Sequence, residues 1–540
     1  MIILRSETVT NRSALEELAR RLEKLESGKV VSQELIWETK LDICKEYSLD
    51  RVPKNSEILA FLNPNSRRFF EEKLRRKSIR TRSGIAVVTA ITKPFDCPHG
   101  TCTFCPGGVR FGTPQSYTQD SPAASFGIER AFDPHTQVRD ALDMLSKNGH
   151  DTSKVELILL GGTILAMPYD YQREFVKRSY DALNQRESSC IEDAIKSNEV
   201  APHRCVGLTI ETKPDWCRRE HIDRLLSYGA TRVEIGVQSL RDDVLRIVNR
   251  GHTVEDTYQA FCVSRDTAFK IVAHMMPGLP LSDPDKDLED LLSLVSDERL
   301  KPDMIKIYPT LVVEGTALYK QYLLGKYEPY DLKQLIELLI KFKKQVPPWL
   351  RIMRIQREIP KHEIQAGANA GNLRQTILDT MALRGERCRC IRCRETGHRQ
   401  VDDRTVEISR LRLKRLDYEA SSGREIFLSF ENEDIDTLFG FLRLRIPSGQ
   451  EHRPEIAGKR ASLVRELHVY GPVVPVGENI QSMEQSQHRG LGTRLLSEAE
   501  EISRTEFRAK KQIVISASGT REYYRKRGYS DDGAFVSKSL

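Results

Sequence analysis

The chain has 540 residues, of which 39% are apolar and 30% charged, and its formal net charge is +7 at pH 7. This length exceeds what one hydrophobic core organises, so we expect about two to four domains. The composition excludes collagen-like, mucin-like and wholly disordered chains, and no apolar run approaches the roughly 20 residues that span a bilayer. We therefore expect a globular, cytoplasmic protein without a membrane segment.

Residues 1–80 are predicted to form a small helical region with a basic end. In ALEELARRLEKLES, leucines recur at spacings of three and four, as on one face of a helix. Between Arg67 and Arg82, eight basic residues face two acidic ones. A solvated helix face would explain one such run. A second basic run, with five arginines around three cysteines between Arg384 and Arg394, favours two surfaces that bind a polyanion.

Residues 81–375 alternate short apolar runs with helical stretches. This pattern predicts an α/β domain whose parallel strands form a partial or full (βα) barrel. The predicted strands are IAVVTAIT, VELILLGG, CVGLTIET, RVEIGVQS, KIVAHMMPG and DMIKIYPT. Several of them end in glycine-rich or polar segments, such as Gly161-Gly162-Thr163 and the one that starts at Glu211. Because barrel enzymes react at the carboxyl ends of their strands, we expect the active site there.

Three cysteines follow the first predicted strand with C-x4-C-x2-C spacing: Cys97, Cys102 and Cys105. Iron-sulfur clusters usually take four protein thiolates, so a loop that supplies three would leave one iron open to an external ligand. The alternative is a structural zinc site that His99 completes. A position at the mouth of a barrel favours the cluster, because an open iron has a use there and a structural zinc does not.

The cysteine loop resembles that of the radical S-adenosylmethionine superfamily, although its spacing is one residue longer than the usual C-x3-C-x2-C. The segments KPFDCPHG, SYTQDSPAA, ETKPDWC and MMPGLP are similar to those of the Elongator catalytic-subunit family of tRNA-modifying enzymes. The resemblance implies a 4Fe-4S cluster on Cys97, Cys102 and Cys105, and S-adenosyl-L-methionine near Gly161, Gly162 and Glu211. Thr163 departs from the Gly-Gly-Glu of many members, which puts the usual carboxylate contact to the methionine amino group in doubt.

A second cysteine triplet, Cys388, Cys390 and Cys393, lies in the linker predicted at 376–400. Three thiolates and one further donor, with His398 five residues on, would complete a tetrahedral zinc site between two domains. An additional iron cluster and three free thiols are the alternatives. Zinc is favoured because a linker away from the strand ends gives a cluster little to do.

Residues 401–540 are predicted to form a second α/β domain. Its strands are REIFLSFE, LFGFLRLRI, SLVRELHVYG and KQIVISAS. The turn Gln487-His488-Arg489-Gly490-Leu491-Gly492-Thr493 opens a helix, and glycines at a helix start let backbone N–H groups approach a pyrophosphate. Tight packing at a helix start is the plain alternative.

This C-terminal pattern resembles the acetyl-CoA-binding core of the N-acetyltransferase (GNAT) superfamily. The resemblance implies that Glu466-Leu467-His468-Val469 form the strand that pairs with pantetheine. It also implies that a tyrosine of the pair Tyr523 and Tyr524 lies near the CoA sulfur as a proton donor, whereas packing is at least as good an account of Tyr523.

The combined resemblance implies a tRNA uridine(34) carboxymethyluridine synthase. In that family a 5′-deoxyadenosyl radical from S-adenosylmethionine abstracts hydrogen from the methyl of acetyl-CoA, and the new radical attacks carbon five of the wobble uridine. Lys154 matches a family lysine implicated in handling acetyl-CoA, and Lys306 is a second catalytic candidate, for which a solvent-facing position is the alternative.

The expected partner is the anticodon stem-loop of tRNA, bound by the two basic surfaces, and the expected assembly is a homodimer or a larger complex with accessory subunits. Two alternatives from other classes are a protein lysine acetyltransferase with a structural iron-sulfur cluster and a non-catalytic RNA-binding scaffold with two structural metals. The first leaves the strand-end motifs without purpose, and the second explains neither the open iron nor the CoA turn.

Overall fold

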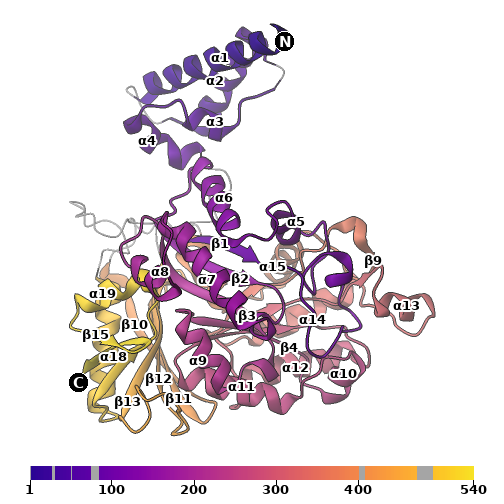
Figure 1. The fold of residues 1–540 in the computed structure, drawn as a ribbon, viewed down its shortest axis with the longest axis vertical. Helices are drawn as coiled ribbons and strands as arrows, with labels where there is room; N and C mark the ends of the chain where they lie inside the picture. Colours follow the sequence, from indigo (N-terminus) through magenta and orange to yellow (C-terminus); the bar gives the residue numbers. More distant parts are fainter. Residues whose placement is uncertain (1, 27–30, 50, 75–83, 400–407, 471–489) are drawn as a thin grey trace.

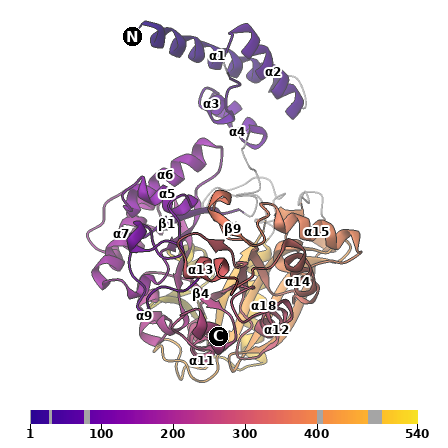
Figure 2. The same cartoon turned by 90° about the vertical axis from the view of Figure 1, so that its right-hand side faces the viewer.

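The N-terminal helices form a small body that projects from the rest of the molecule (Figures 1 and 2). The computed structural model describes residues 2–26, 31–49, 51–74, 84–399, 408–470 and 490–540. The helices of this body are α1 (Ile2–Glu26), α2 (Gln33–Glu46), α3 (Asn55–Leu59) and α4 (Pro64–Leu74). Leu18, Leu22, Ile43 and Phe70 are fully buried between them, so this region has a core of its own.

Seven parallel strands form the central sheet of the largest unit. They are β1 (Ala86–Ile91), β2 (Lys154–Leu160), β3 (Arg204–Thr212), β4 (Arg232–Gln238), β5 (Lys270–Met275), β6 (Met304–Ile307) and β8 (Arg351–Arg354). The strand order is β1-β2-β3-β4-β5-β6-β8, and β1 and β8 do not pair, so the barrel is partial. All six predicted strands are confirmed, and β8 was not predicted.

Helices cover the outer face of this sheet, and near-continuous apolar strands are what a sheet buried on both faces requires (Figure 1). Side-chain caps begin several helices, as where Asp133 accepts from Thr136 N at 2.8 Å. A short hairpin pairs β7 (Val312–Val313) with β9 (Ile364–Ala366). The helices are α5 (Pro122–Ile128), α6 (Pro134–Lys147), α7 (Tyr169–Asn184), α8 (Ile191–Ser197), α9 (Arg219–Ser227), α10 (Asp242–Ile247), α11 (Val254–Asp266), α12 (Pro284–Ser296), α13 (Ala317–Leu323), α14 (Leu332–Gln345) and α15 (Leu373–Leu383).

The C-terminal unit is a mixed seven-stranded sheet with helix α18 (Leu491–Thr505) packed on it. Its strand order is β10-β11-β12-β13-β14-β16-β15, and only β13 and β14 pair in parallel. The strands are β10 (Arg412–Ala420), β11 (Gly423–Asn432), β12 (Thr437–Ile446), β13 (Ala461–Val469), β14 (Lys511–Val514), β15 (Ser530–Asp532) and β16 (Phe535–Ser539), and a short helix α19 spans Arg521–Arg525. The predicted α/β class is confirmed, while β10, β15 and β16 were not predicted.

Buried ion pairs join the two sheets. Arg445 of β12 pairs with Asp266 at 2.6 Å, and Arg465 of β13 pairs with Asp303 at 2.5 Å; all four side chains are at most 3% exposed. Asp303 lies just before β6, and Arg443 donates to the carbonyl of Trp349, just before β8. The C-terminal sheet therefore packs against the amino ends of the barrel strands. Within the described residues, no helix is long and apolar enough to cross a membrane.

Candidate active site

The carboxyl ends of the barrel strands enclose a cavity of about 740 Å³. Its lining includes all three cysteines of the first triplet together with Gly162, Glu211 and Lys306. This is the end of the sheet that faces away from the C-terminal domain. The sequence-based expectation that an active site lies at the strand ends therefore has a cavity to support it.

Two of the cluster-loop cysteines lie beside a cation. Cys102 is buried, and its Sγ is 3.2 Å from His99 Nε2 and accepts from Arg250 Nη1 at 3.8 Å. Burial raises the pKa of the Cys97 thiol, and the positive charge of Arg250 opposes that shift. Gly236 of β4 makes room for the guanidinium, because a Cβ there would lie 2.3 Å from Arg250 Nη2. The loop thus meets a guanidinium suited to thiolate ligands.

The third cysteine sits among neutral polar groups. Cys105 Sγ donates to Gln115 Oε1 at 3.3 Å and lies 3.2 Å from Ser116 Oγ, and burial raises its pKa to about 12. Bound metal deprotonates such a thiol outright. Among the described residues, the three sulfurs are not one of the groups that converge within 4.8 Å, as ligands of one ion do. Sulfurs that bind separate irons of a cluster need no such convergence, so this donor set fits a cluster better than a lone zinc.

The wall below the cysteine loop carries a buried polar network that the sequence analysis missed in part. Glu234 of β4 is fully buried and pairs with Lys306 of β6 and, at 2.9 Å, with His274 of β5. One carboxylate oxygen each of Glu211 and Glu234 and a ring nitrogen of His274 all lie within 4.8 Å of one another. Lys306 is therefore a buried, ion-paired group of the cavity and not a solvent-facing strand end.

Glu234 and Lys306 hold each other in their ionised forms. Burial alone would raise the pKa of Glu234, but Lys306 and His274 bring it well below its usual range. Burial would likewise lower the pKa of Lys306, and Glu234 raises it instead. For Glu211, burial and then the negative charge of Glu234 raise the pKa. The signal that could have found Glu234 and His274 is a charged or titratable residue inside an otherwise apolar strand.

The glycines after β2 accept close contacts from both sides. A Cβ at Gly161 would lie 2.1 Å from Thr92 Oγ1, so only glycine fits there. Gly161 N donates to Glu211 Oε2 at 3.4 Å, and Thr163, which is buried, lies 3.9 Å from Cys97 Sγ. The carboxylate that Thr163 lacks is thus present nearby on the neighbouring strand, at Glu211.

Lys154 lies at the other end of the barrel. It begins β2, a strand of 7 residues, and Gly161 follows that strand, so the two are roughly 20 Å apart at the usual strand rise. Burial lowers the pKa of Lys154. The neighbouring strand begins at Arg204, whose Cβ lies 2.6 Å from where a Cβ on Gly519 would be, in the C-terminal domain. Lys154 therefore lies at the end of the barrel where the C-terminal domain packs, and it does not line the cavity.

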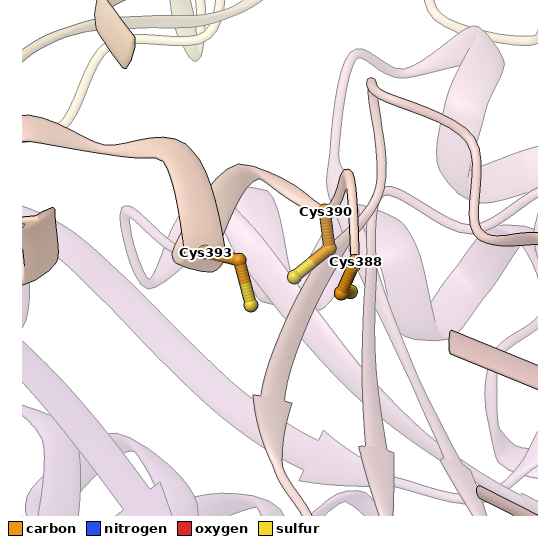
Figure 3. Close-up of side chains that lie close together, drawn as sticks. All are labelled: Cys388, Cys390 and Cys393. Atoms are coloured by element: carbon orange, nitrogen blue, oxygen red, sulfur yellow. The ribbon is translucent and has the colours of Figure 1, made fainter. Parts of the chain in front are cut away.

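The second cysteine triplet converges in space, as Figure 3 shows. The sulfurs of Cys388, Cys390 and Cys393 all lie within 4.8 Å of one another. Hydrogen bonds from Cys388 and Cys393 lower the pKa of Cys390 well below its usual range. Lys343 Nζ donates to Cys393 Sγ at 3.9 Å. The site lies next to the start of β8, where Ile391 N donates to Leu350 O at 2.9 Å. Cys390 caps the short helix α16 (Ile391–Arg394), Cys393 lies within it, and α17 (Thr396–Arg399) follows.

Two residues near the triplet, His398 and Arg394, make other contacts than predicted. His398 Nε2 lies 3.2 Å from Glu395 and is not in the converging group, so the structure does not offer it as the fourth ligand. Arg394 is 1% exposed and donates to the carbonyls of Arg389 and Pro348. The prediction that Arg394 contacts RNA is therefore wrong, because its guanidinium serves the fold. Of the other run, the part at 75–82 lies outside the described residues.

The glycine-rich turn is described from Gly490 onwards; Gln487, His488 and Arg489 lie outside the described residues. Gly490 caps α18 with a φ of 74°, in the left-handed region that favours glycine. A Cβ at Gly492 would lie 2.7 Å from Tyr523 Oη. Leu491 is buried against the sheet, and Thr493 Oγ1 accepts from Arg527 at 2.9 Å. From Gly490 onwards, the described part of the turn thus lies close to the hydroxyl of Tyr523.

The other acetyl-CoA candidates lie on both sides of the C-terminal sheet. Tyr524 is 7% exposed and belongs to the core between the sheet and α18. Leu467 and Val469 are partly buried and pack against this core. Glu466 accepts from Arg443 at 2.8 Å, and the His468 ring lies 4.3 Å from Tyr470. The register of β13 with β14 runs from Ala461 to Val464 and is not continued at 465–468. The two strands separate here, beside the start of α18.

Comparisons with known proteins agree with this architecture. The chain matches family models for the ELP3 N-terminal domain at 13–82, the Radical SAM superfamily at 91–295 and the Radical SAM C-terminal domain at 302–382. It is 44% identical to a tRNA uridine(34) acetyltransferase of Methanocaldococcus infernus, over 97% of this chain and 98% of that one. Elongator complex protein 3 of Homo sapiens is 41% identical over 96% and 95%. A solved structure, the archaeal Methanocaldococcus infernus Elp3 with an N-terminal deletion, is 42% identical and matches with a TM-score of 0.74 over 85% of this chain and 100% of that one.

Proposed function

The chain belongs to the family of Elongator complex protein 3 and archaeal tRNA uridine(34) acetyltransferases within the radical SAM superfamily, and from this we propose that it is a tRNA uridine(34) carboxymethyluridine synthase. The observation that carries the proposal is the cysteine loop after β1, which opens onto a cavity at the carboxyl ends of the barrel strands. That arrangement gives radical chemistry an enclosed site.

Cys97, Cys102 and Cys105 would hold a 4Fe-4S cluster, which supplies one-electron cleavage of S-adenosylmethionine when both are bound. Arg250 stabilises the negative charge of the thiolates beside it. Gly162 and Glu211 line the cavity in which S-adenosylmethionine would bind, and Thr163 offers no carboxylate for its methionine amino group. The walls of the cavity would shield a carbon radical on the sides that they cover.

The C-terminal domain would bind acetyl-CoA in the manner of N-acetyltransferases. Its support is the separation of β13 from β14 after Val464, next to the glycine-capped start of α18. Pantetheine could pair with β13 where its register with β14 has ended, and the helix start favours the pyrophosphate of CoA. Tyr523 lies over this start, while burial raises the pKa of Tyr524, which disfavours loss of its proton. We retain Tyr524 as a proton-donor candidate on the family resemblance alone.

Acetyl-CoA and the cavity then lie at opposite ends of the barrel strands. Lys154, at the amino end of β2, would meet the acetyl arm near the C-terminal domain. The burial-lowered pKa of Lys154 makes its neutral form easier to reach. Delivery of the acetyl group to the cavity must cross the length of the strands, roughly 20 Å.

We propose four functional units: 1–80 for tRNA binding, 81–375 for radical chemistry, 376–400 for a zinc ion and 401–540 for acetyl-CoA. Cys388, Cys390 and Cys393 fit one zinc ion, since thiolates around tetrahedral zinc stand about 3.8 Å apart. The exposed Arg384, Arg387 and Arg389 remain candidates for phosphates of the anticodon stem-loop. The name of the human relative favours a complex with other subunits, and a cytoplasmic location stays a prediction.

The alternative of a protein lysine acetyltransferase leaves the cavity and its ionised network without a use, and the relatives named for tRNA uridine support the first function. The test is anaerobic incubation of the cluster-loaded chain with S-adenosylmethionine, acetyl-CoA, dithionite and tRNA. Formation of 5-carboxymethyluridine at position 34 is the expected result. Acetylated lysine in place of modified uridine would refute it.

A further inference from the structure

We propose that Glu211, Lys306 and Tyr308 read the uracil ring of the target nucleotide inside the cavity, with Glu234 as the residue that positions Lys306. This inference rests on the proposed function and deepens it, because it assigns the choice of uracil to named side chains of the barrel. All three reading residues line the cavity, and Glu234 lies fully buried behind them.

The hydrogen-bonding groups match the edge of uracil. That edge presents the O4 acceptor next to the N3–H donor, and an enzyme that acts on a flipped base reads such an edge directly. Glu211 serves as an acceptor, since its Oε2 already accepts from Tyr117 Oη at 3.3 Å and from Gly161 N at 3.4 Å. Lys306 serves as a donor, because its ammonium carries three protons and Glu234 takes one.

The two groups are held as neighbours. Oxygens of Glu211 and Glu234 lie within 4.8 Å of each other, and Lys306 Nζ is hydrogen-bonded to the Glu234 oxygen. An acceptor for N3–H and a donor for O4 thus face the cavity side by side. Glu234 also fixes His274 at 2.9 Å, so the donor side of the site is held from below by one buried carboxylate.

A cation bound by Glu211, Glu234 and His274 is a poorer occupant. The ammonium of Lys306 already supplies the positive charge at Glu234, and a metal ion would have to displace it. A ring that accepts from Lys306 leaves the ion pair between Lys306 and Glu234 in place. The geometry therefore favours a neutral heterocycle over a metal.

The remaining lining suits a nucleotide. The ring of Tyr308 stands edge-on to His274, with centroids 5.3 Å apart, and is a platform for a stacked base. Arg354 and Arg357 also line the cavity, and Arg357 Nη1 is buried with no hydrogen-bond partner. A phosphate beside the flipped nucleotide would supply that partner.

Base preference tests the assignment. Cytosine presents an acceptor at N3 and an amine at C4, so neither Glu211 nor Lys306 finds its partner. 3-Methyluracil has no N3–H, so Glu211 loses its donor. We expect anticodon stem-loops with C34 or 3-methyl-U34 to bind the wild-type chain at least about tenfold more weakly than U34, measured by fluorescence anisotropy without cofactors. Equal affinities for the three RNAs would overturn the assignment without any variant.

Variants then identify the residues. Glu211→Gln places an amide donor opposite N3, so the U34-to-C34 preference in binding and in product formation should fall about tenfold. Glu234→Gln should lower the same ratio by releasing Lys306, while Glu192→Gln in α8, which removes an exposed ion pair with Arg173, should leave it unchanged. If the wild type forms product and Glu211→Gln keeps the wild-type U34-to-C34 preference, the base-reading assignment is refuted and the proposed function is not. Absence of 5-carboxymethyluridine from the wild type refutes the proposed function itself.

Discussion

Replacement of Arg465 by methionine should destabilise the chain strongly, because this guanidinium neutralises two buried carboxylates at once. It donates to Asp303 at 2.5 and 2.8 Å and to Glu425 at 2.8 and 3.0 Å, and all three side chains are at most 1% exposed. Removing one partner of a buried ion pair typically costs about 3–5 kcal/mol, since it leaves an uncompensated charge. Without Arg465, Asp303 keeps a hydrogen bond from Ile271 N at 2.9 Å and a longer contact to Arg443, at 3.6 Å.

Urea denaturation of the full chain, followed by circular dichroism, measures this loss. Arg424→Met is the matched control, because Arg424 is 45% exposed and pairs with Asp417 at the surface, where such a pair is worth less than about 1 kcal/mol. The double variant Arg465→Met with Asp303→Asn should recover part of the loss. If Arg465→Met costs no more than Arg424→Met, the buried pairs do not hold the two domains together as argued.

Three further predictions concern the other sites. Cys390→Ser should lose about one equivalent of bound zinc by elemental analysis, whereas the exposed Cys190→Ser should retain it; equal zinc in both would contradict the site. Gly492→Ala should weaken acetyl-CoA binding in calorimetry by about tenfold, because its Cβ would lie 2.7 Å from Tyr523 Oη, and Gly371→Ala, whose Cβ would meet only ordinary contacts, should not. Burial and Arg392 lower the pKa of His398 to about 4 in the folded chain, whereas the unfolded value is about 6.5. The unfolded chain therefore binds a proton at His398 more readily, and the free energy of unfolding falls as the pH is lowered from about 6.5 toward 4. The thermal midpoint of His398→Asn should therefore fall less between pH 7 and 5 than that of the wild type, whereas the control His362→Asn should behave like the wild type. If His398→Asn shows the same fall as both, His398 does not cause the pH dependence.

The strands of the barrel could be predicted because each is a continuous apolar run that ends in glycine or polar residues. Strand β8 escaped prediction, since Arg351–Arg354 carries arginine at both ends of only four residues. Its identity as a strand depends on pairing with β6, which is a tertiary fact. The edge strand β10 is similar, because its burial pattern is largely that of an exposed strand.

Site residues that lie close together in one sequence motif could be predicted, whereas residues that only the pairing of different strands brings together were missed. The cysteines of both triplets are close in sequence, so their spacing alone indicated metal ligation. Glu234, His274 and Lys306 lie on three different strands, and only the register of the parallel sheet brings them together. The interfacial role of Arg394 and of Arg465 was hidden for the same reason, since composition cannot distinguish a buried arginine from one that binds RNA.

The most direct test of the radical assignment is the yield of 5′-deoxyadenosine from S-adenosylmethionine under anaerobic conditions with dithionite, after reconstitution with iron and sulfide. The account predicts product with the wild type and with Cys190→Ser, and none with Cys102→Ala. Absence of product from a fully loaded wild-type chain in the presence of tRNA and acetyl-CoA, or undiminished product from Cys102→Ala, would contradict it.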